Sequence, residues 1–514
     1  MTENRTEISR GRRAGPVRSI VIVGGGTAGW MAAAQFVRYF EHQDIDITLI
    51  ESSEIATVGV GEATVPGIRK YIQGLGLSEF DVMRASGGTM KLGIRFIDWR
   101  HEGSEYFHPF SIYGSAKRGI PFHHYWLHMR QEPQTEGLES YSVSALLAKA
   151  GRVRLPQAGF DYIHYNWALH FDAAKFAHVL RNFAIGLGVT RIDAKIVDVE
   201  LAGDDGFIRS LRLHTGQIVH GDLFIDCSGF RSLLLGGALG VRFIDWSHLL
   251  PCDRALAVQC ELKSGLAPYT RAIAREAGWQ WRIPLQHRVG NGYVYASAHV
   301  SDAKAFETLN SNLEGATLSE PNLIKFTTGH REQFWFRNCL ALGLASGFLE
   351  PLESTSITLI QAGIEKLLMQ FPDRSFNPVL AEQHNQSSVL EFERIRDFII
   401  LHYWGNQRIG ETMWDDCRNL QLPDTLAHRI ALFRESGALL RHEHETFWEP
   451  SWLSIFNGLG VLPARANPAV NYFNPDELRT WLAALRRDVR ATAQTGINHE
   501  DFIAQYCAQP EFAP

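Results

Sequence analysis

Short runs of β-branched and apolar residues separated by turns fill the first two thirds of the chain. Residues 19–26 (SIVIVGGG) form an apolar run that ends in glycines, residues 27–40 continue with helix formers, and residues 44–51 (DIDITLIE) form a second apolar run. This order predicts a strand, a tight turn, a helix and a second strand.

Further strand-like runs follow, and the pattern then changes. The middle of the chain alternates short apolar runs with turns, at residues 91–99, 210–229, 255–263 and 292–300. Helical periodicity dominates from about residue 356, in the stretches 356–371, 386–404 and 475–494. We therefore expect an α/β fold with an additional β-sheet and a mostly helical last third.

Bulk composition excludes some function classes. The 514 residues are 45% hydrophobic and 21% charged, which is enough to bury a large core. A formal net charge of −6 argues against a general nucleic-acid binder, because such binding depends on Lys and Arg neutralising phosphates. We expect a small-molecule partner instead.

Cysteine usage and hydropathy indicate the setting. The six cysteines lack CxxC pairs and metal-type spacing, so we expect neither a disulfide framework nor a zinc module, and a reducing cytoplasm fits best. The Arg-rich residues 1–18 have no apolar core, and no later run reaches about 18 apolar residues. We expect no signal peptide and no membrane span.

A glycine motif marks the first predicted turn. Gly24, Gly26 and Gly29 form G-x-G-x-x-G, where missing side chains let a pyrophosphate approach the backbone at a helix N-terminus. Glu51 ends the second strand 22 residues after Gly29, where a carboxylate can accept a hydrogen bond from a ribose hydroxyl. These features predict a dinucleotide site, for FAD or NAD(P), and the small-residue turn in DLFIDCSGFRS (222–232) favours FAD.

Four stretches together resemble one family, the flavin-dependent halogenases of the tryptophan halogenase type. They are GGGTAGWMAA (24–33), VGVGEATVP (58–66), GWQWRIPL (278–285) and FLEPLEST (348–355), and the likeness runs from about residue 19 to 465. The resemblance implies an FAD-binding fold of the flavin monooxygenase, aromatic hydroxylase-like type. It also implies use of FADH2 from a separate NAD(P)H-dependent flavin reductase, with O2 and chloride or bromide as co-substrates.

The resemblance also implies a domain layout and a set of cofactor residues. We expect a flexible tail at 1–18, an FAD-binding module with an inserted sheet at 19–375, and a mostly helical substrate-covering region at 376–514. The expected cofactor-binding residues are Gly24, Gly26, Thr27, Ala28, Gly29, Glu51, Gly61, Glu62, Ala63, Leu349 and Ile357.

Lys91 is the first candidate catalytic residue. On pattern alone, a lysine opposite the apolar face of a strand is most often solvated, because lysines are seldom buried. By resemblance, Lys91 matches the essential lysine of the family. A buried amine can hydrogen-bond hypohalous acid, or lose its proton and form a haloamine, and either would present electrophilic halogen to the substrate.

Glu353 is the second candidate, just before a predicted helix. On pattern alone it could cap that helix together with Ser354 and Thr355. By resemblance it assists catalysis and takes the proton lost from the ring, while Thr355 and Ser356 bind halide through backbone N–H groups at the helix start. The family usually has glycine where this chain has Ser356, so the resemblance leaves the choice between chloride and bromide open.

Aromatic residues suggest the substrate pocket. His108, Phe110, Phe447 and Trp448 match positions where the family sandwiches an indole ring, although aromatic pairs are often plain core packing. Tryptophan-specific members grip the amino-acid group with a Tyr-Tyr and acidic segment, and this chain has the shorter GALLRHEHETFW (437–448) there. We expect an indole without the amino-acid group, or a bulkier electron-rich aromatic.

The double-tryptophan stretch suggests a wall. Trp279 and Trp281 are two residues apart, so a strand would point both rings to the same face. The resemblance implies that Trp279, Trp281, Ile283 and Pro284 line the passage between flavin and substrate, admitting hypohalous acid and excluding organic substrate from the flavin.

Two histidine-containing groups have the residue types of metal ligands. His124 with His128, and His442 with Glu443 and His444, lack a placed third ligand, so we predict no metal site.

Two alternative functions remain beside a halogenase. One is a flavin-dependent aromatic hydroxylase, which transfers oxygen directly to its substrate, and the other is a flavin-binding protein that has lost its chemistry.

Overall fold

The structure is a computed structural model that describes residues 15–54, 61–130, 132–133, 135–155 and 164–510. A mostly parallel sheet contains the two strands predicted first. Its six strands lie in the order β21-β22-β13-β1-β2-β9, and all pairs are parallel except β21 with β22. The bounds are β1 Ser19–Val23, β2 Asp46–Glu51, β9 Thr190–Asp193, β13 Leu223–Asp226, β21 Trp335–Phe336 and β22 Cys339–Ala341.

The predicted strand, turn, helix and strand are confirmed at the start of this sheet. Helix α2 (Thr27–Tyr39) connects β1 to β2 and buries a run of small residues that lets it lie close to the sheet. Because β1 pairs with β2 on one side and β13 on the other, the chain changes direction at β1, where open α/β sheets bind ligands.

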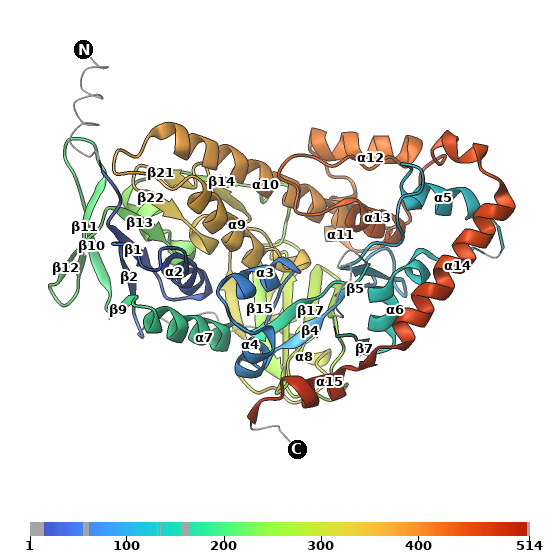
Figure 1. Cartoon of the computed structure of the whole chain (residues 1–514), viewed down its shortest axis with the longest axis horizontal. Helices are drawn as coiled ribbons and strands as arrows, with labels where there is room; N and C mark the ends of the chain where they lie inside the picture. Colours follow the sequence, from blue (N-terminus) through green and yellow to red (C-terminus); the bar gives the residue numbers. More distant parts are fainter. Residues whose placement is uncertain (1–14, 55–60, 131, 134, 156–163, 511–514) are drawn as a thin grey trace, which may run out of the picture.

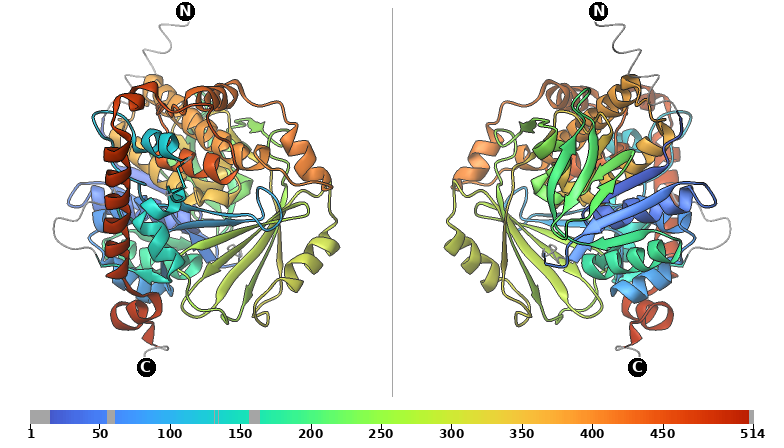
Figure 2. Two further views of the ribbon diagram at one scale, coloured as in Figure 1. Left: turned by 90° about the vertical axis from the view of Figure 1, so that its right-hand side faces the viewer. Right: turned by 90° about the vertical axis from the view of Figure 1, so that its left-hand side faces the viewer.

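The expected additional sheet has seven strands in the order β19-β15-β18-β17-β16-β5-β6. Only β16 and β5 pair in parallel. Every residue of β17 and β18 is buried, so both faces of the sheet centre are covered. The bounds are β5 Gly93–Ile97, β6 Glu105–Pro109, β15 Arg254–Cys260, β16 Thr270–Arg275, β17 Gly278–Pro284, β18 Val289–Tyr295 and β19 Asn322–Lys325. Figure 2 shows this sheet as a fan of strands with α8 beside it.

A small sheet in the order β3-β8-β4 carries Lys91, at the end of β4. Its strands are β3 Gly61–Ala63, β4 Thr89–Lys91 and β8 Ala168–Asp172, and residues 58–60 of the VGVGEATVP stretch lie outside the described ranges. The other short strands are β7 Arg152–Val153, β10 Ile196–Leu201, β11 Ile208–Leu213, β12 Ile218–His220, β14 Phe243–Asp245, β20 Gly329–Arg331, β23 Gly347–Phe348 and β24 Ile497–Asn498.

The last third is helical, as predicted. Its helices are α9 Ser356–Met369, α10 Pro378–Trp404, α11 Thr412–Arg418, α12 Asp424–Ser436, α13 Glu449–Gly458, α14 Pro475–Gln494 and α15 His499–Tyr506. Helix α10 begins before the predicted residue 386, because Asn377 caps its N-terminus and Pro378 occupies its first turn. Earlier helices are α3 Gly67–Gly74, α4 Glu79–Ser86, α5 Phe122–Met129, α6 Val143–Lys149, α7 Ala173–Gly186 and α8 Asp302–Ser311.

Helix α10 connects the side of the molecule with the parallel sheet to the side with the later helices. It contacts α9 and β21 on the side of the parallel sheet and α11, α12 and α13 on the other (Figure 1). Buried residues of the seven-stranded sheet and of α10–α14 form one continuous hydrophobic cluster, whereas α2 and one face of the parallel sheet belong to a second and the other face of that sheet to a third. The helical region therefore packs on the additional sheet, and the boundary at 375/376 stays a prediction.

The end of the predicted tail is attached to the body. Pro16 bridges to Asp373, Val17 is buried and the Arg18 backbone N–H donates to Asp222, so residues 16–18 belong with the module, while residues 1–14 lie outside the described ranges. Among the described helices, none is long and apolar enough to cross a membrane.

Candidate functional site

A cavity of about 1170 Å³ lies at the carboxyl ends of β1 and β13 and reaches the start of α9. All the predicted cofactor residues except Gly29 line it, namely Gly24, Gly26, Thr27, Ala28, Glu51, Gly61, Glu62, Ala63, Leu349 and Ile357. A side chain on Gly29 would place Cβ 1.8 Å from the Gly24 carbonyl oxygen. Gly29 is therefore needed for close packing of α2 on the turn rather than for contact with a ligand.

The glycine turn is shaped to hold a phosphate group. Gly24 has φ +110°, and a Cβ there would lie 2.2 Å from the Cys227 carbonyl oxygen, so only glycine fits between the two strand ends. No side chain caps α2 at Gly26, and Arg181 and Lys195 also line the cavity. Open N–H groups and nearby cations suit a pyrophosphate.

Glu51 ends β2 at the wall of the cavity, as predicted. Its carboxylate accepts hydrogen bonds from Arg191 Nε and, at 3.3 Å, from Trp30 Nε1. Glu51 thus lies beside the glycine turn in a fixed orientation. The size of the cavity, the glycine turn and this acid together fit FAD.

The opposite end of the cavity is the start of α9. A 3₁₀ turn at Pro351–Glu353 leads through Ser354, whose φ of +61° is unusual for a residue with a side chain, to Thr355 and α9. The buried Thr355 hydroxyl has no hydrogen-bond partner among the described residues, and no side chain caps the helix. Ser356 lines the cavity, whereas the neighbouring Thr355 is not among the lining residues. An unpaired hydroxyl beside a helix N-terminus is a combination that suits a small anion.

Lys91 is fully buried, which rules out the solvated alternative. Its Nζ donates to the Thr64 carbonyl oxygen at 2.9 Å and to Ser354 Oγ at 2.8 Å, and it lies 5.0 Å from the centroid of the Phe110 ring. Burial lowers the pKa of Lys91 to about 7, although the charge of Glu353 opposes the shift. The amine can therefore exist in both protonation states near neutral pH.

Glu353 is also fully buried, and its carboxylate contacts two histidines rather than capping α9. One oxygen lies 2.9 Å from His108 Nδ1 and the other 2.9 Å from His402 Nε2. Burial alone would raise the pKa of Glu353, but the charge and hydrogen bonds of His108 and His402 outweigh it and lower the pKa to about 2. Glu353 is thus an ionised carboxylate in a dry site.

The expected substrate residues divide into two groups. The centroid of the His108 ring lies 6.3 Å from that of Phe110 and 6.2 Å from that of Phe447. These three rings therefore surround the region of Lys91 and Glu353. Trp448 differs from them, because its side chain is 56% exposed and the Arg441 guanidinium lies 4.3 Å from its ring centroid.

The double-tryptophan stretch forms part of the cavity wall. Trp279, Trp281 and Ile283 line the cavity, and the two tryptophan ring centroids lie 6.1 Å apart, on the shared strand face that their spacing predicts. Pro284 points to the other face and is not among the lining residues; its carbonyl oxygen accepts from Thr89 Oγ1 at 2.7 Å. Its place in a passage wall is therefore not supported by the geometry.

Several polar residues of the site were missed from the sequence. Ser354 holds Lys91, His402 holds Glu353, and Glu350 accepts hydrogen bonds from Trp279 and Tyr403. The EPLE spacing, with acids three residues apart before a helix, was a possible signal for Glu350. His402 lies in a mostly apolar helical stretch, and no local pattern distinguishes it.

The remaining polar candidates have ordinary roles. His124 Nδ1 accepts from the backbone of Asn467, and the backbone N–H of His442 donates to Glu445. In the described part of the chain, no group of three or more His, Cys, Asp or Glu side chains is arranged to hold a metal ion. All six cysteines are buried free thiols.

Comparison with known proteins gives consistent matches over nearly the whole chain. The family model for tryptophan halogenase matches residues 19–475. The 7-chloro-L-tryptophan 6-halogenase KtzR of Kutzneria sp. (strain 744) is 36% identical over 95% of this chain and 99% of its own length.

Solved structures give the same result. BrvH, a flavin-dependent halogenase from Brevundimonas sp. BAL3, is 49% identical with a TM-score of 0.92, covering 95% of this chain and 99% of its own. Xcc4156, a flavin-dependent halogenase from Xanthomonas campestris, is 42% identical with a TM-score of 0.94, covering 97% of this chain and 100% of its own.

Proposed function

The chain belongs to the tryptophan halogenase family and is a flavin-dependent halogenase, and we propose that it halogenates an indole or another electron-rich aromatic ring through Lys91. The observation that carries the proposal is the position of Lys91. Lys91 is fully buried and donates a hydrogen bond to Ser354. Ser354 in turn lines the cavity that fits flavin.

The cavity residues would hold FAD along one wall. The glycine turn and α2 would bind the pyrophosphate, Glu51 the ribose, and Leu349 and Ile357 the ring end. Reduced FAD, when bound, supplies the electrons with which oxygen and halide give hypohalous acid. Thr355 and Ser356 would hold chloride or bromide at the start of α9, because the buried Thr355 hydroxyl otherwise has no partner among the described residues.

Lys91 would present the oxidised halogen to the ring. Its ammonium form can donate a hydrogen bond to hypohalous acid, and its amine form can take the halogen from hypohalous acid to give a haloamine and water. Its lowered pKa makes both forms accessible, and the bonds to Thr64 and Ser354 fix where the nitrogen lies.

Glu353 would stabilise the ring cation and take its proton. Electrophilic attack puts a positive charge on the substrate ring, and an ionised carboxylate in a water-poor site stabilises that charge strongly. His108 and His402 keep Glu353 ionised and correctly oriented.

The pocket favours a ring without an amino-acid group. The names of relatives such as KtzR give tryptophan derivatives as their substrates. In this chain the buried acid of the 437–448 segment, Glu445, is already bound to Arg429 at 2.6 Å and to Trp452 at 3.0 Å. That acid is not free to bind a substrate ammonium group, so we propose an indole or a bulkier aromatic.

A decisive experiment supplies FAD, a separate NADH-dependent flavin reductase, oxygen and either chloride or bromide. Mass spectrometry of indole and tryptophan should show the halogen isotope pattern, with indole the better substrate. Oxygenated product without halogen would support the hydroxylase alternative instead, and no turnover of any aromatic would support a flavin-binding protein without chemistry.

The Lys91→Ala variant tests the route within that assay. We expect it to bind FAD and consume reduced flavin as the wild type does, with halogenated product reduced by about 100-fold or more, because the delivering nitrogen is gone. Halogenation at the wild-type rate would remove Lys91 from the mechanism.

A further inference from the structure

A second carboxyl group, Glu350, is buried behind the cavity wall. Its side chain is fully buried, and one oxygen, Oε2, accepts from Trp279 Nε1 and from the Tyr403 hydroxyl, each at 2.7 Å. The other oxygen, Oε1, has no hydrogen-bond partner among the described residues. Burying a carboxyl group with an unpaired oxygen costs free energy, so this group calls for an explanation.

The partners of Glu350 connect it to the site. Trp279 forms part of the cavity wall next to Trp281, and its Nε1 is the one polar atom of its side chain. Tyr403 follows His402 in α10, so adjacent residues of one helix hold Glu350 and Glu353. The 3₁₀ turn is thus joined to α10 through Glu350, which precedes it, and through Glu353, which ends it.

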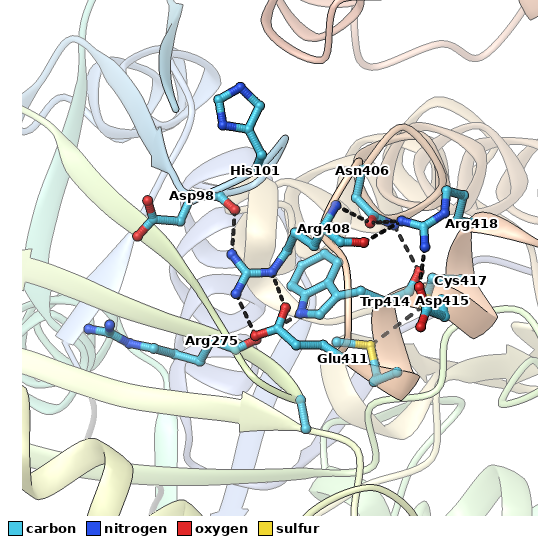
Figure 3. Close-up of polar contacts among 12 residues, drawn as sticks. Asp98, His101, Arg275, Asn406, Arg408, Glu411, Trp414, Asp415, Cys417 and Arg418 are labelled. Carbon is cyan, nitrogen blue, oxygen red and sulfur yellow. Dashed lines mark hydrogen bonds and ion pairs between the residues drawn. The ribbon is translucent and has the colours of Figure 1, made fainter. Parts of the chain in front are cut away.

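The far side of Tyr403 is braced as well. Its ring stacks on Trp414 with centroids 5.5 Å apart, and Trp414 Nε1 donates to the Arg275 carbonyl oxygen at 2.7 Å. Figure 3 shows Trp414 beside Arg408, which donates to Glu411 and to the Asp98 carbonyl oxygen. Through Tyr403, Glu350 therefore connects the buried Trp414 and its partners to the Trp279 ring of the cavity wall.

We propose that Glu350 is a positioning residue that fixes the Trp279 ring, so that hypohalous acid made in the cavity is held for Lys91 instead of escaping. The proposal rests on the proposed function. Without its acceptor, the indole N–H of Trp279 would be buried and unpaired, and the ring would turn to find another partner. A displaced ring opens the wall at the point where the oxidant must be contained.

The state of Glu350 suits this role. Burial raises its pKa to about 7, against the effect of the hydrogen bonds from Trp279 and Tyr403, so the protonated and ionised forms are both populated near neutral pH. An amide has the same shape and can supply the same acceptor. Glu350→Gln should therefore keep the Trp279 contact, and Glu350→Leu should lose it.

The test measures how the oxidised halogen is divided. Wild type and variants are turned over with FAD, flavin reductase, NADH, oxygen, bromide and indole, with and without monochlorodimedone as a trap for free hypohalous acid. The readout is the amount of trapped oxidant divided by the amount of bromoindole, each measured per NADH consumed. A smaller folded fraction alone would not change this ratio.

Glu350→Leu removes the acceptor of both hydrogen bonds and should raise that ratio roughly fivefold, the factor expected from losing the one that holds Trp279, with FAD affinity unchanged. Glu350→Gln should stay near the wild-type ratio. Tyr403→Phe, the matched control, removes the other donor and keeps the Trp279 bond, so it should leak much less than Glu350→Leu.

Trp279→Phe provides an independent check should Glu350→Leu fold poorly, because it keeps a ring but removes the N–H. It should leak as Glu350→Leu does. Wild-type ratios in both variants, or a leak in Glu350→Gln as large as in Glu350→Leu, would overturn the role of Glu350. Wild-type protein that yields neither bromoindole nor trapped oxidant would refute the proposed function itself.

Discussion

Glu350 precedes the 3₁₀ turn and Glu353 ends it, and the two acids differ in their partners and in the direction of their pKa shifts. Both side chains are fully buried, and both bind adjacent residues of α10. Burial raises the pKa of Glu350 to about 7, whereas at Glu353 the effect of burial is outweighed by two histidines and the pKa falls to about 2. Burial alone therefore does not decide whether an interior acid is charged.

The partners explain the difference. Glu350 meets an indole N–H and a phenol, which donate hydrogen bonds without carrying charge. His402 donates from Nδ1 to the Phe398 carbonyl oxygen at 2.8 Å, so a proton must also lie between its Nε2 and Glu353. The charge and hydrogen bonds of His108 and His402 therefore hold the pKa of Glu353 low.

The strongest way to break the comparison is to make the same change at both acids. Glu353→Gln should lower the halogenation rate by about 100-fold to 10,000-fold, the usual contribution of an acid or base, because the charge that stabilises the ring cation and accepts its proton is lost. Glu350→Gln should stay near the wild-type rate. Initial rates of haloindole formation at saturating reduced flavin measure both, and similar losses at the two positions would contradict the distinction.

His402→Gln sharpens the comparison by removing charge from one side only. A glutamine can still donate to Glu353, but the cation that offsets the carboxylate is gone, so the pKa of Lys91 should rise by about one unit. Glu353→Gln should lower it instead, since the attraction to Lys91 disappears.

Carbon-13 NMR of labelled lysine, followed against pH, reports the Lys91 titration directly. Of the other groups near it, burial keeps the pKa of His170 and His499 lowered, so both stay neutral over the useful range. Shifts of the same sign in the two variants would contradict the assigned charges.

The last expected effect concerns stability. Burial lowers the pKa of Lys91 from 10.5 to about 7, so protonated Lys91 disfavours the folded state; the penalty is complete below pH 7, declines between pH 7 and 10.5, and is absent above. Lys91→Met should stabilise the fold by about 1–3 kcal/mol at or below neutral pH, after the loss of two hydrogen bonds. Urea unfolding of both proteins across that range measures the difference, and a gap that widens as pH rises would contradict it.

Much of the fold was predictable because its signals are local. The strand, glycine turn and helix at 19–40 and the helical last third follow from apolar spacing, and the i,i+2 spacing correctly placed Trp279 and Trp281 on one face. Helix α7 was missed, since its short apolar pattern lies among strand-like runs. The start of α10 was placed too late because a cap, rather than periodicity, sets it.

The candidate site was predictable only in part, for the same reason. The resemblance pointed to Lys91 and Glu353, and the structure brings both to one buried region with His108, Phe110 and Phe447. It did not point to His402, Glu350 or Tyr403, because their partners lie far away along the chain. Alternation along β17 excludes Pro284 from the wall, although Pro284 is adjacent to Ile283 in the same stretch.

The sequence alone determined the glycine turn, the order of the elements and the face on which each wall residue lies, because these depend on neighbours a few residues apart. The tertiary structure decided which acid is charged. His108 is 245 residues from Glu353 and His402 is 49, while Trp279 is 71 residues from Glu350. The charge of a buried group depends on the partners that folding brings within hydrogen-bond distance, and no local pattern records them.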